Sequence, residues 1–421
     1  MRALSLATVF AALSGFVVII IAAWALGDDI SLTTDFNAYW GLFFAGTGVL
    51  TGFMQEITRA VSAARHAEDG HPTATTTLDK RTTAHPLVVA GGVALLIAAL
   101  IAVTAPAWMH LILSSHQRIG TVLLAAGLAS YAVQAAVSGV LSGCQLWRQY
   151  AALVAIDSGI RMIIAIIAWL AGWKILAFLV VTVIGAGTWV LIVASSTQVR
   201  ATLRAAVTDV SPSVFIRQAA TAMAASGATA VLITGFPTLV RITNPDTTGQ
   251  AVTAAAVIYA VTLTRAPLLV PLQQFQSAII VRFVHKQGRP FTALAAPIAL
   301  VWVVGVIGAG LAWLIGPWLM EVILRNEAFS VPGAILALLT LGATCTGTLM
   351  ITGSATIAIN KHGFYLSGWV VATVVAVGLL LGPWELATAA GLALIVGPLS
   401  GLLIHTVGLL RAPHQEELCP V

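Results

Sequence analysis

Charged residues are scarce in this sequence: they make up 8% of its 421 residues, against about 25% in soluble domains. So few charges exclude a water-soluble chain of this length, because they could not cover its surface. Hydrophobic residues account for 59%, and the mean hydropathy is +0.98. An alternating pattern typical of a barrel is also absent, so membrane-spanning helices are the solution that remains.

Cysteines and nucleotide-binding motifs are equally sparse. The chain has three cysteines, Cys144, Cys345 and Cys419, and their spacing favours neither a disulfide framework nor a metal site. No Walker-type glycine loop occurs, so we expect no ATPase activity in this chain. The net charge of +5 lies in the loops between apolar runs and does not indicate a nucleic-acid partner. We expect no cofactor.

Apolar runs recur along the whole chain, and each is long enough to cross about 30 Å of hydrocarbon as a helix. About twelve spans follow from this pattern. Their approximate limits are 4–26, 36–55, 87–109, 118–141, 150–172, 175–196, 215–240, 250–276, 292–318, 333–357, 363–382 and 386–410. The first apolar run is longer than that of a signal peptide and is expected to remain as an uncleaved helix. The sequence thus predicts an all-α polytopic membrane protein.

Lysine and arginine residues gather on one side of these spans: about fourteen of the twenty lie there, which by the positive-inside rule is the cytoplasmic side. Both termini are therefore expected in the cytoplasm. Anionic head groups of membrane lipids are expected contacts for these loops. The cytoplasmic loop 56–86 is expected to begin as a continuation of the second helix. The connector 198–218 is expected to be short and amphipathic.

The two halves of the chain resemble each other. The second span ends in "TGFMQEITRAV" and the eighth in "QQFQSAIIVRFV". The fourth ends in "SGVLSGCQLWRQY" and the tenth in "TGSATIAINKHGFY", which share the order glycine, amide, basic residue, tyrosine. This repeat predicts two pseudo-symmetric six-helix lobes, residues 1–205 and 206–421, around a central cavity that holds the substrate site.

Three ionisable residues fall inside the predicted spans: Asp157, Arg161 and Arg265. Each costs about 2.5–3.5 kcal/mol at the centre of a membrane helix, so such residues normally face a bundle interior or a wet cavity. Asp157 and Arg161 are four residues apart and can pair on one helix face. The pair is either a structural ion pair or a cavity-lining arginine that Asp157 positions.

Arg265 lies in "VTLTRAPLLVPLQQFQ", residues 261–276, with no acidic residue within four positions. A guanidinium group is always charged and binds phosphate oxygens through two parallel hydrogen bonds. Arg265 is therefore a candidate anion site; the alternatives are a cross-helix pair with Asp157 or a side chain that reaches an interface. Pro267 and Pro271 are expected to kink this helix beside a cavity.

Amide and hydroxyl side chains form a second group of candidates. Amides suit sugar hydroxyls, although interfacial glutamines need no ligand and small-residue packing explains polar groups inside spans equally well. The candidates are Gln55, Gln273, Gln274 and Gln276 near the cytoplasmic mouth, and Asn37, Gln134 and Ser138 within spans.

The chain resembles the polysaccharide-biosynthesis flippases of the multidrug/oligosaccharidyl-lipid/polysaccharide exporter superfamily. The resemblance covers most of the chain and rests on "FMQEITRAV", "GCQLWRQY", "TRAPLLVPLQQFQSAIIVRFV" and the six-plus-six plan. It implies an O-antigen-type flippase of the bacterial plasma membrane, which moves a polyprenyl-diphosphate-linked glycan to the outer leaflet by alternating access. It also implies a lipid-linked anionic glycan as substrate. We further expect a monomer, with polymerases or glycosyltransferases as candidate partners.

Two other functions stay open. A small-molecule exporter of the same superfamily is one, although the first span lacks the carboxylate that many drug exporters carry there. A polytopic glycosyltransferase is the other, since the external loop "GDDISLTTD" supplies Asp28, Asp29 and Asp35. These acids also fit an ordinary solvated loop, and the short external loops leave no room for an acceptor-binding domain. We therefore expect a transporter and not an enzyme.

Overall fold

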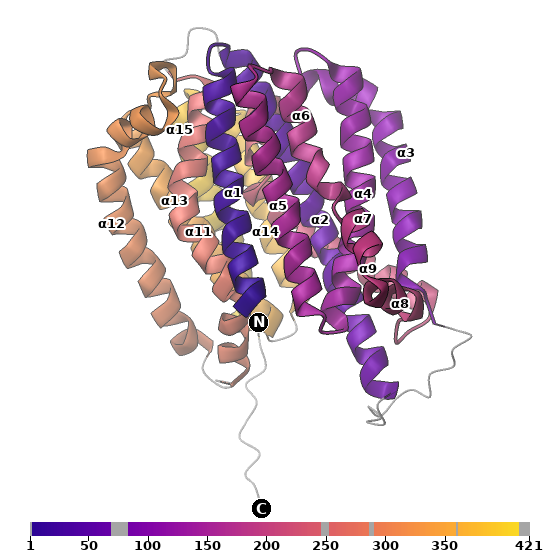
Figure 1. Cartoon of the computed structure of the whole chain (residues 1–421). Coiled ribbons are helices and arrows are strands. Elements are labelled where there is room, and N and C mark those ends of the chain that lie inside the picture. The colour runs from indigo at the N-terminus through magenta and orange to yellow at the C-terminus, as the bar shows by residue number, and fades with distance from the viewer. Residues whose placement is uncertain (1, 69–82, 246–251, 286–289, 359–360, 412–421) are drawn as a thin grey trace, which may run out of the picture. The chain divides into compact units, whose positions relative to one another are not determined.

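The structure is a computed structural model that describes residues 2–68, 83–245, 252–285, 290–358 and 361–411 (Figure 1). Within these ranges all regular elements are helices and no strand occurs. The chain divides into two compact units, Met1–Thr238 (unit 1) and Leu239–Val421 (unit 2). Each unit is described by itself below.

Unit 1 holds the longer part of the chain. Figure 1 shows that α8 lies at the same end of this unit as the start of α1. Its helices are α1 (Arg2–Leu26), α2 (Ile30–Glu68), α3 (Pro86–Ile112), α4 (Gln117–Gly143), α5 (Trp147–Leu170), α6 (Ile175–Ile184), η1 (Gly185–Gly187), α7 (Trp189–Ser195), α8 (Thr197–Ala205) and α9 (Pro212–Ile233). The short α10 (Phe236–Thr243) carries the chain out of unit 1.

Unit 2 contains the remaining helices. They are α11 (Ala254–His285), α12 (Pro290–Leu324), η2 (Glu327–Phe329), α13 (Gly333–Ala358), α14 (His362–Leu380) and α15 (Leu386–Leu410). A small apolar cluster in this unit joins α11, α12, α13 and α15, with Val301 and Ile351 among its buried members.

The predicted spans are confirmed as helices, each falling on one helix or on consecutive helices. In the described part of the chain, 9 helices are long and apolar enough to cross a membrane, or 10 if α9 and α10, which meet at 64°, count as one span. The remaining predicted spans fall on α2, which carries more charged residues, and on α11, whose part Ala254–Leu269 is apolar but shorter than a span. The chain is therefore an all-α, multi-pass membrane protein, as the sequence predicted.

The outer faces of the helices are apolar, as contact with lipid requires. On α3, Leu95 is 74% exposed and Val103 is 79% exposed, and on α12 Trp313 and Leu314 are similarly open. Soluble monomers rarely expose apolar patches of this kind. These faces therefore fit hydrocarbon, while the helices' other sides pack together.

One helix is central in each unit. The fourth predicted span, α4, packs against α2, α3 and α6, and the tenth, α13, packs against α11, α12 and α15. Those neighbours correspond to each other in the predicted repeat. The first and seventh spans differ, because α1 packs on α5 whereas α9 packs on α2 within unit 1. The compact units thus divide after residue 238, and the predicted lobes 1–205 and 206–421 stay a prediction.

Three local expectations can be compared with the helices. The second helix continues beyond its predicted span to Glu68, as expected for the start of loop 56–86. The connector contains α8, whose first turn is capped by Ser196 Oγ, which accepts from the N–H of Val199 at 3.2 Å. The helix α11 continues through Pro267 and Pro271 from residue 254 to residue 285, so the kink expected there stays a prediction.

Candidate functional site

The predicted pair of Asp157 and Arg161 is present on α5. Arg161 Nη2 lies 2.9 Å from Asp157 Oδ1, and the side chains are 5% and 18% exposed. The Arg161 guanidinium also lies over the rings of Phe43 and Phe44 on α2, at 5.5 and 5.0 Å from their centroids. A buried cation gains from aromatic faces as well as from its carboxylate. The charge of this arginine is thus compensated by Asp157, and its side chain is enclosed within unit 1.

A 3-10 turn interrupts the α-helical pattern of the sixth predicted span beside this pair, and this interruption is called the break below. The 3-10 turn Gly185–Gly187 separates α6 from α7, and a Cβ at Gly185 would collide with Asp157 Oδ1 and with the Arg161 guanidinium. Side chains satisfy the carbonyls at the break: Thr188 Oγ1 donates to Gly185 O at 2.8 Å, and Ser130 Oγ donates to Ala186 O at 2.7 Å. Backbone groups freed inside a membrane need such partners.

Gln134, on α4, completes this polar cluster. It is 4% exposed, and its amide lies 3.2 Å from Thr188 Oγ1. With the amide turned so that its nitrogen faces the break, it can donate to Ala186 O at 3.1 Å and to Gly185 O at 3.2 Å. The structure thereby brings together three of the predicted site residues, Asp157, Arg161 and Gln134, around the break.

Two other polar candidates in the spans are buried, as expected for cavity or packing positions. Asn37 is 3% exposed and donates from Nδ2 to Thr33 O of its own helix at 2.8 Å. Ser138 is 6% exposed on α4, one turn beyond Gln134. The bond within α2 accounts for Asn37 without a ligand.

Arg265 lies in unit 2 and is 5% exposed. Val261 and Leu269, one turn before and after it on α11, are 2% and 3% exposed. Leu269 and Leu272 approach Gly347 of α13. Arg265 therefore lies on the packed side of α11. This position disfavours the alternative in which its side chain extends along the lipid-facing side to a membrane interface.

The glutamine candidates are not brought together by the described residues. Gln55 lies on an exposed face of α2. Gln273, Gln274 and Gln276 lie on α11, but their side chains are outside the part of the chain that the structure describes. A sugar contact by these amides stays a prediction.

The acidic segment that was predicted to be an external loop spans the turn before α2 and the first turns of that helix. Asp29 Oδ1 accepts from two N–H groups in the first turn of α2, at 2.9 and 3.2 Å. Burial raises the pKa of Asp29, but hydrogen bonds from the Leu32 N–H and from the side chain and N–H of Ser31, together with the charge of Lys174, bring the pKa below its ordinary value. Asp35 Oδ2 accepts from the N and Oγ of Ser114, both at 2.6 Å. Lys174 Nζ lies 3.8 Å from Asp28 Oδ2. The glycosyltransferase interpretation relied on these three acids; Asp29 and Asp35 bind backbone groups of unit 1, whereas the contact of Asp28 with Lys174 is exposed.

Sequence reasoning missed the residues that complete the unit 1 cluster. They are Phe43, Phe44, Ser130, Gly185 and Thr188. The stretch "VIGAGTW" was a usable signal, because two glycines and a threonine inside an apolar run favour a helix break. The aromatic pair carried no such signal, since phenylalanine is ordinary in a membrane helix.

Solved structures with a similar fold are transporters. An inward-facing multidrug resistance MATE family transporter of the MOP superfamily aligns with a TM-score of 0.71 at 13% identity, covering 95% of this chain and 94% of that one. The lipid II flippase MurJ in an inward closed conformation aligns with a TM-score of 0.66 at 16% identity, covering 97% and 91%. A MOP superfamily transporter from Pyrococcus furiosus aligns with a TM-score of 0.68 at 13% identity, covering 98% and 95%. The chain therefore has the fold of MOP superfamily transporters.

Relatives in sequence are mycobacterial proteins. The uncharacterized protein Mb3654 of Mycobacterium bovis is 37% identical over 405 residues, which are 96% of this chain and 90% of that protein. The uncharacterized protein Rv1510 of Mycobacterium tuberculosis is 37% identical over 383 residues, 90% of this chain and 84% of that protein. This chain belongs to the same family as these mycobacterial proteins. No family model matches the chain.

Proposed function

We propose that this protein is a flippase that moves a polyprenyl-diphosphate-linked glycan from the inner to the outer leaflet of the plasma membrane by alternating access. The observation that carries the proposal is Arg265, a permanent cation that is 5% exposed on the packed side of an apolar helix. A charge in such a position is costly and by default marks a functional site.

The substrate's diphosphate supplies the charge that fits this position. Guanidinium binds phosphate oxygens through a planar fork, and such charge-assisted bonds are shorter and stronger than neutral ones. The lipid tail and most sugar groups offer no comparable charge. Arg265 would therefore bind the diphosphate, while hydroxyl and amide groups elsewhere would meet the glycan.

Arg161 receives a different role in this proposal. Its guanidinium is paired with Asp157 at 2.9 Å and covered by two phenylalanine rings, so binding a phosphate would first require that it leave both. The Asp157–Arg161 pair, together with Gln134, then holds α4, α5 and the interrupted sixth span together. Of the two readings of the pair, we favour the structural one.

A small-molecule exporter is the second candidate. The likeness to a multidrug resistance transporter, with a TM-score of 0.71, favours it as much as the likeness to a lipid II flippase favours the first. The candidates differ in the substrate that accumulates when the protein is absent. A flippase leaves lipid-linked glycan in the inner leaflet, whereas an exporter leaves a soluble compound in the cytoplasm.

Depletion of the protein in its own cells tests the proposal. Polyprenyl-linked glycans are extracted and measured by mass spectrometry, before and after a membrane-impermeant reagent modifies those in the outer leaflet. We expect unmodified glycan to accumulate and to return to normal when the wild-type gene is supplied, but not when Arg265→Ala is supplied. Unchanged glycan levels with accumulation of a soluble compound would favour the exporter.

A further inference from the structure

Helices α2 and α9 pack closely through small residues, and this contact is called the α2–α9 seam below. A Cβ at Gly52 of α2 would collide with the carbonyl of Ala222 on α9, and one at Gly227 of α9 would lie 3.0 Å from Val49 Cγ2 of α2. Small residues let membrane helices approach in this way, so that packing contacts supply the attraction. Packing alone does not set where such a seam opens. The polar contacts at its two ends differ, and they set that point.

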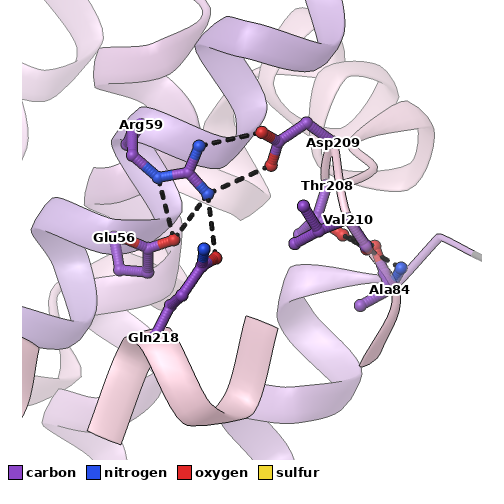
Figure 2. A network of polar contacts seen from close by, with 7 residues as sticks. All are labelled: Glu56, Arg59, Ala84, Thr208, Asp209, Val210 and Gln218. Carbon is purple, nitrogen blue, oxygen red and sulfur yellow. Dashed lines mark hydrogen bonds and ion pairs between the residues drawn. The ribbon is translucent and has the colours of Figure 1, made fainter. Parts of the chain in front are cut away.

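An arginine forms the polar contact at one end of the seam, as Figure 2 shows. Arg59 of α2 donates to Asp209 Oδ2 from Nη1 at 2.8 Å and to Gln218 Oε1 of α9 from Nη2 at 3.2 Å. It also donates to Glu56 Oε1 of its own helix, from Nε at 3.0 Å and from Nη2 at 2.7 Å. Because Glu56 lies on α2 as well, the Arg59 charge keeps a carboxylate partner even when Asp209 and Gln218 move away.

The connector that carries Asp209 is fixed just before this residue. The N–H of Thr208 donates to Ala84 O at 3.0 Å, and the N–H of Ala84 donates to Thr208 Oγ1 at 3.0 Å (Figure 2). Thr208 is fully buried, so the connector is anchored at this point to the segment that precedes α3. Thr208 Oγ1 also donates to Val210 O at 2.8 Å, across a bend in the chain.

This bend keeps length in reserve between the anchor and α9. The helix begins at Pro212, after Ser211 in an extended conformation with φ −65° and ψ 156°. The chain from Thr208 to Pro212 can span about 14 Å when it is fully extended. Straightening the bend therefore lets the start of α9 move away from α2 while Thr208 stays in place.

The opposite end of the seam is held by a buried contact. Thr238 Oγ1 donates to Ala38 O at 2.7 Å, and these residues are 6% and 0% exposed. The side chains of Arg59 and Asp209, in contrast, are 43% and 21% exposed. Separating a buried pair leaves groups without hydrogen-bond partners, whereas water replaces the partner of an exposed group. The seam therefore opens with less loss at the Arg59 end.

We propose that Arg59, Asp209 and Gln218 form a gate, and that α9 separates from α2 at this end while the opposite end stays closed. The inference rests on the alternating access in the proposed function, and it assigns the gate to the side predicted to be cytoplasmic. When the gate opens, Arg59 stays paired with Glu56, the Asp209 carboxylate becomes hydrated and the connector straightens. Helix α9 then moves relative to the first six spans, as the predicted division into two lobes requires.

Distances between spin labels test the gate without any substrate. One protein carries labels at Arg65→Cys and Ser213→Cys, exposed positions of α2 and α9 near the gate. A second protein carries labels at Ser31→Cys and Thr234→Cys, exposed positions near the opposite end of the seam. The native cysteines are replaced by serine in both. Pulsed electron resonance in lipid nanodiscs is expected to give two 65/213 distances and one 31/234 distance.

Two substitutions weaken the gate from the α9 side and from the connector. Gln218→Ala and Asp209→Asn are each expected to raise the ratio of the longer to the shorter 65/213 distance about threefold. The matched control is Gln198→Ala, which removes an exposed amide contact between α5 and α8, where Gln149 Nε2 donates to Gln198 Oε1 at 3.1 Å. A single 65/213 distance in every variant would overturn the gate. So would an equal ratio in all variants, or a 31/234 distance that varies with them.

A disulfide across the seam tests whether transport needs this opening. The Cβ of Val49 lies 3.8 Å from the position of a Cβ at Gly227, which suits a disulfide. Val49→Cys and Gly227→Cys are made in the protein without native cysteines. The matched control joins α2 to α4 through Val61→Cys and Gly143→Cys, whose Cβ positions are 3.1 Å apart. Both pairs are oxidised in membranes, and glycan export is measured with and without a reductant.

Oxidation of the pair at 49 and 227 should stop export and a reductant should restore it, whereas the control pair should stay active when oxidised. Continued export with the pair at 49 and 227 oxidised would overturn the gate. The two measurements separate the gate from the proposed function. A reduced protein that exports no glycan, with two 65/213 distances that respond to Gln218→Ala, would retain the gate and contradict the flippase.

Discussion

The central helices of the two units, α4 and α13, have corresponding neighbours but use polar side chains differently. On α13, Thr340, Thr344, Thr346 and Thr348 are buried, and each bonds to a carbonyl of its own helix four residues earlier at 2.8–3.0 Å. On α4, Gln134 and Ser130 instead reach the broken sixth span. These four threonines of α13 thus bond within their own helix, whereas Gln134 and Ser130 of α4 connect two helices.

This difference predicts where polar groups matter for stability. A hydroxyl bonded to its own backbone can be removed with little harm, because the carbonyl keeps its helical hydrogen bond. A group that joins two helices leaves an unsatisfied partner behind when it is lost, and that partner is costly when buried. Polar contacts between helices also occur in unit 2: the His405 ring lies between Thr352 Oγ1 at 3.1 Å and Tyr365 O at 3.2 Å, and Asn244 Nδ2 donates to Leu380 O at 3.3 Å.

The largest effect is expected at the ion pair. Asp157→Ala leaves the Arg161 charge buried and unpaired, which we expect to cost about 3 kcal/mol, at the lower end for a buried pair because Asp157 keeps some exposure. Asp157→Leu with Arg161→Met should recover most of this loss. The measurement is unfolding by SDS in detergent micelles. A double variant no more stable than Asp157→Ala would contradict the pairing.

A smaller effect is expected at the helix break. Gly185→Ala places a methyl group against Asp157 and Arg161, and we expect overpacking to cost about 2 kcal/mol. Gly187→Ala is the matched control, because a Cβ there meets nothing within 4 Å. The same unfolding measurement compares the two variants. Equal stability would show that the pair can move away from Gly185 without cost.

The smallest effects are expected when a buried threonine is replaced by valine in each of the two units. Thr188→Val in unit 1 removes a hydroxyl shared with the Gln134 amide, and we expect a loss of about 1 kcal/mol. Thr348→Val in unit 2 removes a hydroxyl that donates to Thr344 O of its own helix at 2.9 Å. We expect a change of less than about 0.5 kcal/mol there. The reverse order of the two would refute the contrast between the units.

Sequence patterns predicted the features that are local along the chain. Apolar runs marked the spans, and the four-residue spacing of Asp157 and Arg161 predicted their pair. Contacts between distant segments had no such signal: Arg59 and Asp209 are 150 residues apart. The rings of Phe43 and Phe44 meet Arg161 because α2 and α5 share one core, and no spacing encodes that. The bend of 64° between α9 and α10 was missed because the apolar run continues through it.

Transport by purified protein tests the role of Arg265 most directly. The protein is reconstituted in vesicles with a fluorescent polyprenyl-diphosphate glycan, and a membrane-impermeant quencher reports the fraction in the outer leaflet over time. Wild-type protein should equilibrate the glycan. Arg265→Ala should slow this by about tenfold or more, and Arg265→Lys should restore it in part, since an ammonium keeps the charge without the planar fork. A folded Arg265→Ala protein that moves the glycan at the wild-type rate would contradict the account.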